Sequence, residues 1–467
     1  MSSPSLLQGN SLAARDAKSL IHSYTNLSTH LTEGPLIIET GKGVNVYDED
    51  GKEYIEGLAG LWCASFGFGE EELIEAAIEQ MRKLPFYHSF ASKSTEPGIR
   101  LAEKLLDIAP VPFSKVFFAN SGSEANDTVV KLVWYYNNSL GRPEKKKIIS
   151  RQKGYHGVTV AAASLTGLPP LHNDFDLPIK NILHTSCPHY YRYGKDGETE
   201  EEFATRCADD LEKLILKEGP DTVAAFIAEP IMGAGGVIIP PATYFEKIQA
   251  VLRKYDVLMI ADEVICGFGR TGQMWGSQTF DIQPDSLSCA KALSSAYLPI
   301  SAVMVSQDIF DGMVKQSEKH GAFAHGFTYS GHPVPAAVGM RTMELMEERN
   351  ILGHVRHVSK RFVERFEALA DHPLVGEVRA TGLIGAIELV ADKKTKRSFD
   401  PKFKAGAKTA QAMQDAGVIS RAVAGDNLAL CPPLIITEDE IDEMFDRFTK
   451  GLDDVTAMAF RENWQKD

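Results

Sequence analysis

The sequence lacks the features that mark membrane-spanning, secreted and disulfide-rich proteins. Its 467 residues contain no run of about 18 apolar residues, so we expect no segment that spans a membrane. Six cysteines are scattered along the chain without a CxxC pair, which fits free thiols in a reducing compartment. The first residues, MSSPSLLQGNSLAARD, have neither the apolar core of a secretory signal nor the composition of an organelle transit peptide. We therefore expect a cytoplasmic protein.

An excess of positive charge is also missing. The chain has 49 Lys and Arg against 63 Asp and Glu, which gives a formal net charge of −14. Because an acidic surface repels nucleic acid and anionic lipid, we expect neither nucleic acid nor a membrane as a partner. The length exceeds what one simple core accommodates and predicts at least two domains.

Apolar, strand-like runs alternate with helical segments through the middle of the chain, which is typical of an α/β fold. The runs are continuously apolar, as in a parallel sheet that is covered on both faces. Strands are expected at 115–119, 147–150, 222–228, 257–261 and 300–305, and helices at 124–139, 201–217 and 244–255.

The two ends of the chain follow a different pattern. Residues 36–56 carry turn signals between short strands, which predicts an antiparallel meander. After about residue 340, helical stretches alternate with a short β-like segment. We predict a large α/β domain at 71–339 and a small α+β domain that combines residues 1–70 with residues 340–467.

The first motif with chemical potential is NSGSEAND at 120–127, which follows an expected strand and opens a helix. Ser121, Gly122 and Ser123 offer hydroxyl groups and free backbone N–H groups at a helix N-terminus, a combination that binds phosphate. A plain N-cap from Ser123 explains the same residues when the motif is considered by itself.

Two further motifs place a carboxylate and a lysine at the ends of apolar runs. Asp262 follows the run 257–261, and ligands bind at the carboxyl ends of strands in open α/β sheets. A buried carboxylate needs a partner such as the pyridinium nitrogen of pyridoxal 5′-phosphate (PLP), a basic side chain or a metal ion. Lys291 follows SLSCA, where burial lowers the pKa of a lysine and makes its amine nucleophilic. A lysine at a strand end can instead extend into solvent.

These motifs gain meaning together, because a phosphate cup, a buried carboxylate and a buried lysine are the contacts that PLP requires. Tyr155, followed by His156, adds an aromatic ring that suits stacking on the pyridine. Glu229 adds another acid at the end of an expected strand. We therefore predict that this set of residues binds PLP.

Six stretches of the chain resemble class III, or ω-, aminotransferases: NSGSEAND, KGYHG, AEPIMGAGG, IADEVICGFGRTG, CAKALSSAYLP and HGFTYSGHP. The resemblance covers nearly the whole chain and is strongest to the pyruvate-dependent 4-aminobutyrate and ω-amine aminotransferases. It implies PLP fold type I, with a mainly parallel, seven-stranded sheet in the large domain.

The resemblance also implies roles for individual residues. Lys291 binds PLP as a Schiff base and then moves the proton of the reaction, while Asp262 holds the pyridinium N–H. Val264 presses on the second face of the ring. Thr328 reaches the phosphate of the neighbouring subunit's cofactor, which makes the protein a homodimer with shared active sites, or a tetramer built from such dimers.

The substrate pocket follows from the same resemblance. Trp62, Phe90 and Tyr155 line it, and apolar walls favour donors with an uncharged or weakly polar tail. Arg421 matches the arginine that binds the carboxylate of the keto acid, a task that suits the planar guanidinium. A surface arginine in a turn is the alternative interpretation.

We therefore expect an aminotransferase that moves an amino group from an ω-amino acid or primary amine to pyruvate. The candidate donors are 4-aminobutyrate, β-alanine, a diamine and an aryl-alkyl amine, and the products are alanine and an aldehyde or ketone. A 2-oxoglutarate-linked class III aminotransferase, a decarboxylating dialkylglycine-type enzyme and a non-enzymatic PLP-fold protein remain as alternatives. His184, Cys187 and His189 have metal-like spacing but no fourth ligand nearby, so we expect no metal site.

Overall fold

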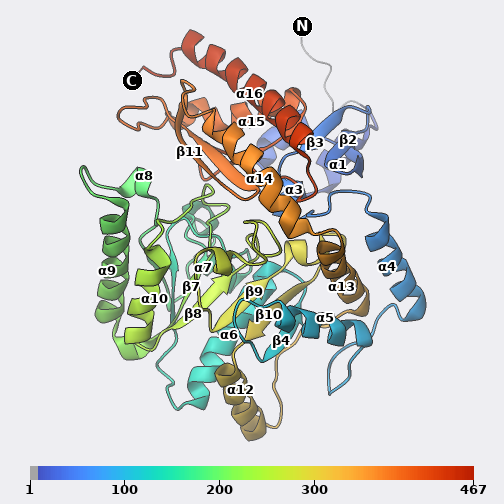
Figure 1. Ribbon diagram of the computed structural model, residues 1–467, viewed down its shortest axis with the longest axis vertical. Helices are drawn as coiled ribbons and strands as arrows, with labels where there is room; N and C mark the ends of the chain where they lie inside the picture. The colour runs from blue at the N-terminus through green and yellow to red at the C-terminus, as the bar shows by residue number, and fades with distance from the viewer. Residues whose placement is uncertain (1–8, 467) are drawn as a thin grey trace.

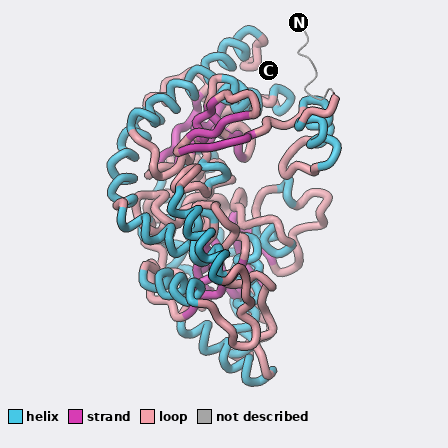
Figure 2. The backbone as a smooth tube through the Cα atoms, turned by 90° about the vertical axis from the view of Figure 1, so that its right-hand side faces the viewer, coloured by secondary structure: helices cyan, strands magenta, loops and turns pink. Residues whose placement is uncertain are grey.

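The computed structural model describes residues 9–466, and its secondary structure is arranged in two regions. In Figure 1 the lower region surrounds the largest sheet, while the upper region combines elements from both ends of the chain. Figure 2 shows the strands as two groups, one in each region. Within residues 9–466, no helix has the length and apolar character that a bilayer crossing requires.

The lower region contains a seven-stranded sheet in the order β4-β10-β9-β8-β7-β5-β6. The β10 strand runs antiparallel to both of its neighbours, and the other pairs are parallel. The mainly parallel sheet expected from the sequence is therefore confirmed. Its strands are β4 (Lys115–Ala119), β5 (Lys147–Arg151), β6 (Ile182–Thr185), β7 (Val223–Ala228), β8 (Leu258–Asp262), β9 (Ser286–Cys289) and β10 (Ser301–Val305).

The continuous apolar strands arise because helices cover both faces of this sheet. Phe226 and Met259 pack with the helices α9 (Glu200–Glu218) and α10 (Tyr244–Lys254). The next residues along the same strands, Ile227 and Ile260, pack on the other face with α6 (Gly122–Ser139) and α12 (Gln307–His320). Successive side chains of a strand point to opposite faces, so both must be apolar here.

The upper region holds two four-stranded sheets that join the ends of the chain. The first consists of β1 (Ile38–Lys42), β2 (Asn45–Asp48), β3 (Glu53–Glu56) and β13 (Val418–Ile419), with β13 parallel to β3. The second consists of β11 (Val375–Thr381), β12 (Ile384–Leu389), β15 (Asn427–Leu430) and β14 (Arg421–Val423). The helices α14 (Ile351–Glu367), α15 (Ala405–Asp415) and α16 (Glu438–Arg461) pack beside them.

The other helices connect and cover these sheets. They are α1 (Leu12–Ser19), α2 (Leu27–Glu33), α3 (Ala59–Trp62), α4 (Glu71–Lys83), α5 (Glu96–Asp107), α7 (Val160–Leu165), α8 (Tyr190–Tyr193), α11 (Gly276–Thr279) and α13 (Pro333–Glu348).

The predicted domain boundary at 339/340 falls inside α13. The division of the chain at 70/71 and 339/340 stays a prediction. Residues 1–8 and 467 lie outside the described residues.

The five strands expected in the central sheet agree with the structure to within one residue at each end. The edge strand β6 was not predicted, because its sequence ILHT is short and only partly apolar. The β10 strand also shows why a continuous apolar run does not report strand direction: it is fully buried like β7, yet it pairs antiparallel.

An aromatic cluster in the upper region provides a test of the packing. Phe445 on α16 is 0% exposed and packs edge-to-face on Phe366 of α14, with ring centroids 4.9 Å apart. We expect Phe445→Ala to lower the free energy of unfolding by about 3–5 kcal/mol, because it removes a buried ring and leaves a cavity. Phe460 lies on the same helix and is 53% exposed, so Phe460→Ala should change the free energy of unfolding by less than about 0.5 kcal/mol. Equal losses for both variants in urea denaturation would contradict the packing.

Candidate active site

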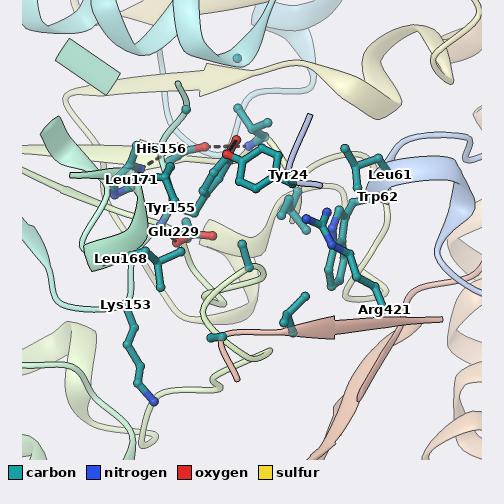
Figure 3. A pocket seen from close by; sticks show the side chains of 18 of the residues that line it. Tyr24, Leu61, Trp62, Lys153, Tyr155, His156, Leu168, Leu171, Glu229 and Arg421 are labelled. Atoms are coloured by element: carbon teal, nitrogen blue, oxygen red, sulfur yellow. Dashed lines mark hydrogen bonds and ion pairs between the residues drawn. The ribbon is translucent and has the colours of Figure 1, made fainter. Parts of the chain in front are cut away.

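A cavity of about 560 Å³ lies where the ends of several strands of the central sheet meet the upper region. Its walls come from the N-terminal segment, from residues at the ends of strands of the central sheet, from residues 168–171 and from the strand β14 (Figure 3). Of the residues expected from the sequence, it is lined by Trp62, Gly122, Ser123, Tyr155, His156, Glu229, Asp262, Val264, Lys291 and Arg421. Ser121, Phe90 and Thr328 are not among the residues that line it.

Asp262 ends β8 with a buried carboxylate that three groups hold in place. Its Oδ2 atom lies 2.7 Å from Nδ1 of His156 and accepts a hydrogen bond of 2.8 Å from the side-chain amide of Asn126. Its Oδ1 atom accepts the backbone N–H of Val264 at 3.1 Å. Because a carboxylate oxygen has more than one acceptor direction, Oδ1 can accept a further donor from the cavity.

Asn126 is a site residue that the sequence reasoning missed. Its amide donates to Asp262 and to the carbonyl of His156, while its own oxygen accepts the Ser288 hydroxyl at 2.7 Å. Ser288 lies on β9 directly opposite Asp262 in the parallel register. The available signal was its place within the motif NSGSEAND, and the structure shows that Asn126 is fully buried on α6.

Glu229 positions the loop that carries Tyr155. Its two carboxylate oxygens accept the backbone N–H groups of Tyr155 at 2.9 Å and Gly233 at 3.0 Å. Burial raises the pKa of Glu229, and the two hydrogen bonds compensate part of the cost of burying its charge. Burial raises the pKa of Tyr155, and a hydrogen bond with Tyr24 raises it further. The Tyr155 hydroxyl therefore keeps its proton at neutral pH.

Lys291 begins the short 3₁₀ turn η3 (Lys291–Ser294) directly after β9. Its backbone has φ 51°, the left-handed region that non-glycine residues rarely adopt and that is enriched at functional sites. Within residues 9–466 its amine has no ion pair or hydrogen bond. Burial lowers the pKa of this amine, which increases the fraction of the nucleophilic neutral form near neutral pH.

The N-terminus of α6 opens into the same cavity. Ser121 is the N-cap, and its hydroxyl accepts the backbone N–H of Glu124 at 3.2 Å. The cap considered from the sequence therefore exists, but Ser121 provides it rather than Ser123. Ser123 instead accepts the backbone N–H of Val158 at 3.1 Å. The first N–H groups of the helix have no acceptor within the helix and are available to an anion.

These residues fit PLP in size and in chemistry. A side chain in place of Gly122 would bring its Cβ to 3.1 Å from Val264, so the bare backbone keeps this corner of the cavity open. The helix N-terminus suits the phosphate, the Asp262 carboxylate suits the pyridinium N–H, and the Lys291 amine suits the aldehyde.

Arg421 on β14 extends toward Trp62 and Tyr24 on the other side of the cavity (Figure 3). Its guanidinium lies 5.5 Å from the centre of the Tyr24 ring, and it has no ion pair within residues 9–466. Its donors are therefore available to a carboxylate. Tyr24, whose hydroxyl lies 3.3 Å from that of Tyr155, is a second residue that the sequence reasoning missed. No motif marked it, because it joins the cavity only through tertiary contact.

Phe90 and Thr328 lie apart from the cavity of their own chain. Both are exposed, and a Cβ on Gly326 would approach the Phe90 ring to 3.2 Å, so the two segments are neighbours. His184 and His189, considered above for a metal, point to different partners: His184 to the carbonyls of Leu165 and Thr166, and His189 to Glu377.

The model of the family named Aminotransferase class-III matches residues 28–452. The chain belongs to the class III aminotransferase family. Its cofactor is PLP, and its fold is PLP fold type I, as expected from the sequence.

Two curated plant relatives are similar to this aminotransferase over most of its length. Gamma aminobutyrate transaminase 3, chloroplastic, of Solanum lycopersicum is 55% identical over 421 residues, which cover 90% of this chain and 81% of the relative. Gamma-aminobutyrate transaminase 1, mitochondrial, of Oryza sativa subsp. japonica is 57% identical over 411 residues, 88% and 80% of the two chains. The crystal structure of the omega transaminase from Pseudomonas jessenii in complex with PMP has a TM-score of 0.95 and 55% identity, and covers 96% of this chain and 99% of its own.

The cytoplasmic location expected for this aminotransferase is wrong, because these plant relatives are named as chloroplastic and mitochondrial enzymes. The expectation rested on the unpaired cysteines and on the composition of MSSPSLLQGNSLAARD. Free thiols indicate a reducing environment and do not distinguish one reducing compartment from another.

The lowered pKa of Lys291 predicts how PLP attaches to the apo-aminotransferase. A protonated amine cannot attack the aldehyde, so the attachment rate should rise with pH and level off above the pKa of Lys291. We expect the midpoint below the ordinary lysine value of about 10.4, measured from the change in visible absorbance when the lysine bonds to the aldehyde. Lys291→Ala lacks the amine and should show no such change, whereas Lys153→Ala, which alters another lysine of the same cavity, should retain it. A midpoint at the ordinary value would contradict the buried site.

Proposed function

We propose that this aminotransferase moves an amino group from an ω-amino acid or a primary amine to pyruvate, giving alanine and an aldehyde or ketone. The observation that carries the proposal is the Arg421 guanidinium, which faces the cavity without an ion pair and is framed by Tyr24 and Trp62. One available guanidinium matches one substrate carboxylate. The names of the relatives, which include gamma-aminobutyrate and omega transaminases, support the same donor class.

Several residues of the cavity have distinct tasks in the proposed reaction. When bound, PLP takes up the amino group and accepts the electrons that the departing proton leaves behind. Lys291 would hold the cofactor and, when its amine is free, would carry the proton of the reaction as base and then as acid. Asp262 keeps the ring nitrogen protonated by offering it a carboxylate that His156 and Asn126 orient.

The remaining residues position the reacting groups. The N-terminus of α6, with Gly122 and Ser123, takes the phosphate. Tyr155 and Val264, which both line the cavity, would pack on the two faces of the ring. Glu229 fixes the backbone of Tyr155, because its carboxylate accepts the Tyr155 N–H. Arg421 orients the carboxylate of pyruvate so that its keto group faces the reacting amine.

The charges of the cavity favour pyruvate over 2-oxoglutarate. A dicarboxylate needs two cationic groups, and besides Lys291 and Arg421 the only cationic lysine or arginine among the lining residues is Lys153. Figure 3 shows Lys153 extending away from Tyr155 and Arg421, and its amine lies 5.7 Å from the centre of the Tyr193 ring. A second carboxylate beside Arg421 would therefore be left without a partner, which is costly in a partly apolar cavity.

We also propose that the enzyme is a homodimer with shared sites. Thr328 and Phe90 are neighbours that are exposed on their own chain, and Phe86, Tyr87 and Tyr329 form further exposed aromatic surface there. Such a patch is typical of an interface between subunits. In the dimer, Thr328 would contact the phosphate of the neighbouring site, and Phe90 its substrate pocket. Light scattering at assay concentration should give the mass of two or four chains; a single-chain mass with full activity would contradict the proposal.

An acceptor comparison tests the proposed reaction. With 4-aminobutyrate or a carboxylate-free aryl-alkyl amine as donor, we expect pyruvate to yield alanine much faster than 2-oxoglutarate yields glutamate. Release of CO₂ in step with amino transfer would instead favour the decarboxylating alternative. A strong preference for 2-oxoglutarate would overturn the pyruvate assignment.

The Arg421→Leu variant tests the residue that carries this assignment. Loss of a charged hydrogen-bonding pair costs about 1.5–3 kcal/mol, so kcat/KM for pyruvate should fall about 10- to 150-fold. The half-reaction with a carboxylate-free amine should be nearly unchanged, because this donor does not need the guanidinium. Lys153→Leu removes the other lysine noted above and serves as the matched control. Equal losses with pyruvate and with the carboxylate-free amine would contradict a carboxylate-binding role.

A further inference from the structure

Three potential metal-binding side chains meet in the N-terminal segment, away from the PLP contacts. Asp16 lies on α1, His22 in the loop that follows, and His30 on α2. The Nε2 atoms of His22 and His30 lie 2.8 Å and 3.0 Å from the same oxygen, Oδ1 of Asp16. The two imidazole rings face each other with centroids 4.2 Å apart. The three ligand atoms thus converge on one point from three places in the chain.

The charge of this cluster is not balanced by a permanent cation. Within residues 9–466, the two histidines are the only ion-pair partners of Asp16, and they are positive only when protonated. The Asp16 and His30 side chains are 13% and 6% exposed, so water screens the carboxylate poorly. A cation bound between the three groups would supply the missing positive charge.

The geometry lies close to that of a zinc site. Zinc binds imidazole nitrogen and carboxylate oxygen at about 2.0–2.2 Å, and tetrahedral bonds of that length place neighbouring ligand atoms about 3.3 Å apart. The observed nitrogen–oxygen distances of 2.8 Å and 3.0 Å need to widen by only a few tenths of an ångström. His22 is 33% exposed, so its side chain has room for that shift, and water can take the fourth position.

We propose that Asp16, His22 and His30 bind a divalent transition-metal ion of the Zn²⁺ type, which fastens the N-terminal segment over the active-site cavity. The sequence did not predict this site, because its three ligands are separated by five and seven residues and match no compact zinc motif. The contacts of His22 and His30 with Asp16 are the metal-free state of the same cluster.

The site connects to the cavity through the loop between α1 and α2. Tyr24 lies two residues after His22, and its hydroxyl and ring contact Tyr155 and Arg421. Its backbone has φ 52°, an uncommon conformation that surrounding contacts must maintain. A metal ion that ties His22 to α1 and α2 therefore holds Tyr24 beside the two residues assigned to the ring and to the substrate carboxylate. This link rests on the proposed function, whereas metal binding itself does not.

Zinc titration of the holoenzyme tests the site directly. The protein, saturated with PLP and freed of metal by a chelator, should bind about one Zn²⁺ per chain in competition with a chromogenic chelator. His22→Gln and Asp16→Asn should weaken binding by more than about tenfold, since a lost ligand costs at least as much as a lost outer hydrogen-bonding partner. His357→Gln alters an exposed histidine elsewhere and should leave the affinity unchanged.

Limited proteolysis gives a second readout that does not depend on catalysis. Tyr24 is 60% exposed, so chymotrypsin should cleave after it, and Zn²⁺ should slow this cleavage in the wild type but not in His22→Gln. Thermal unfolding of each variant shows that it is folded. If folded His22→Gln and Asp16→Asn bind Zn²⁺ as tightly as the wild type, or if the wild type binds none, the proposal is overturned and the cluster is a hydrogen-bonded contact only. A wild-type protein that binds Zn²⁺ but does not transaminate would instead count against the proposed function.

Discussion

The burial of the Asp262 carboxylate is the constraint on which the active site depends. A charge at the end of a buried strand is costly unless donors surround it, and this need recruits parts of the protein that are distant in sequence. Asn126 comes from a helix, His156 from a loop and Ser288, through Asn126, from the adjacent strand. The parallel register that sets Ser288 opposite Asp262 thus also sets the position of the carboxylate. The strand pairing of the sheet and the hydrogen bonds around Asp262 therefore depend on the same register.

The same sheet edge explains how one cavity combines opposite chemical needs. The ends of parallel strands and the start of α6 supply the carboxylate, the lysine and the anion-binding N–H groups within a short distance. Burial then acts on each group separately: it lowers the pKa of Lys291 and raises that of Glu229. The lysine becomes a better nucleophile, while the glutamate serves as a hydrogen-bond acceptor for the Tyr155 backbone.

The cavity wall that carries Arg421 depends on both ends of the chain. Arg421 lies on β14, and Tyr24 and Trp62 come from the N-terminal segment, so neither end alone can form this wall. Parallel pairing of β13 with β3 brings the two ends together. Asp262 and Lys291, by contrast, lie at the ends of strands of the central sheet.

The sequence by itself determined the α/β class, most of the central strands and many of the residues that line the cavity, because continuous apolar runs and short motifs such as NSGSEAND are local signals. Only the tertiary structure decided that β10 runs antiparallel, that Asn126 supports Asp262, and that Tyr24 reaches the cavity. Strand direction depends on chain connections rather than on local apolar pattern. The Asn126–Asp262 and Tyr24–Tyr155 contacts each span more than a hundred residues, so no short segment encodes them.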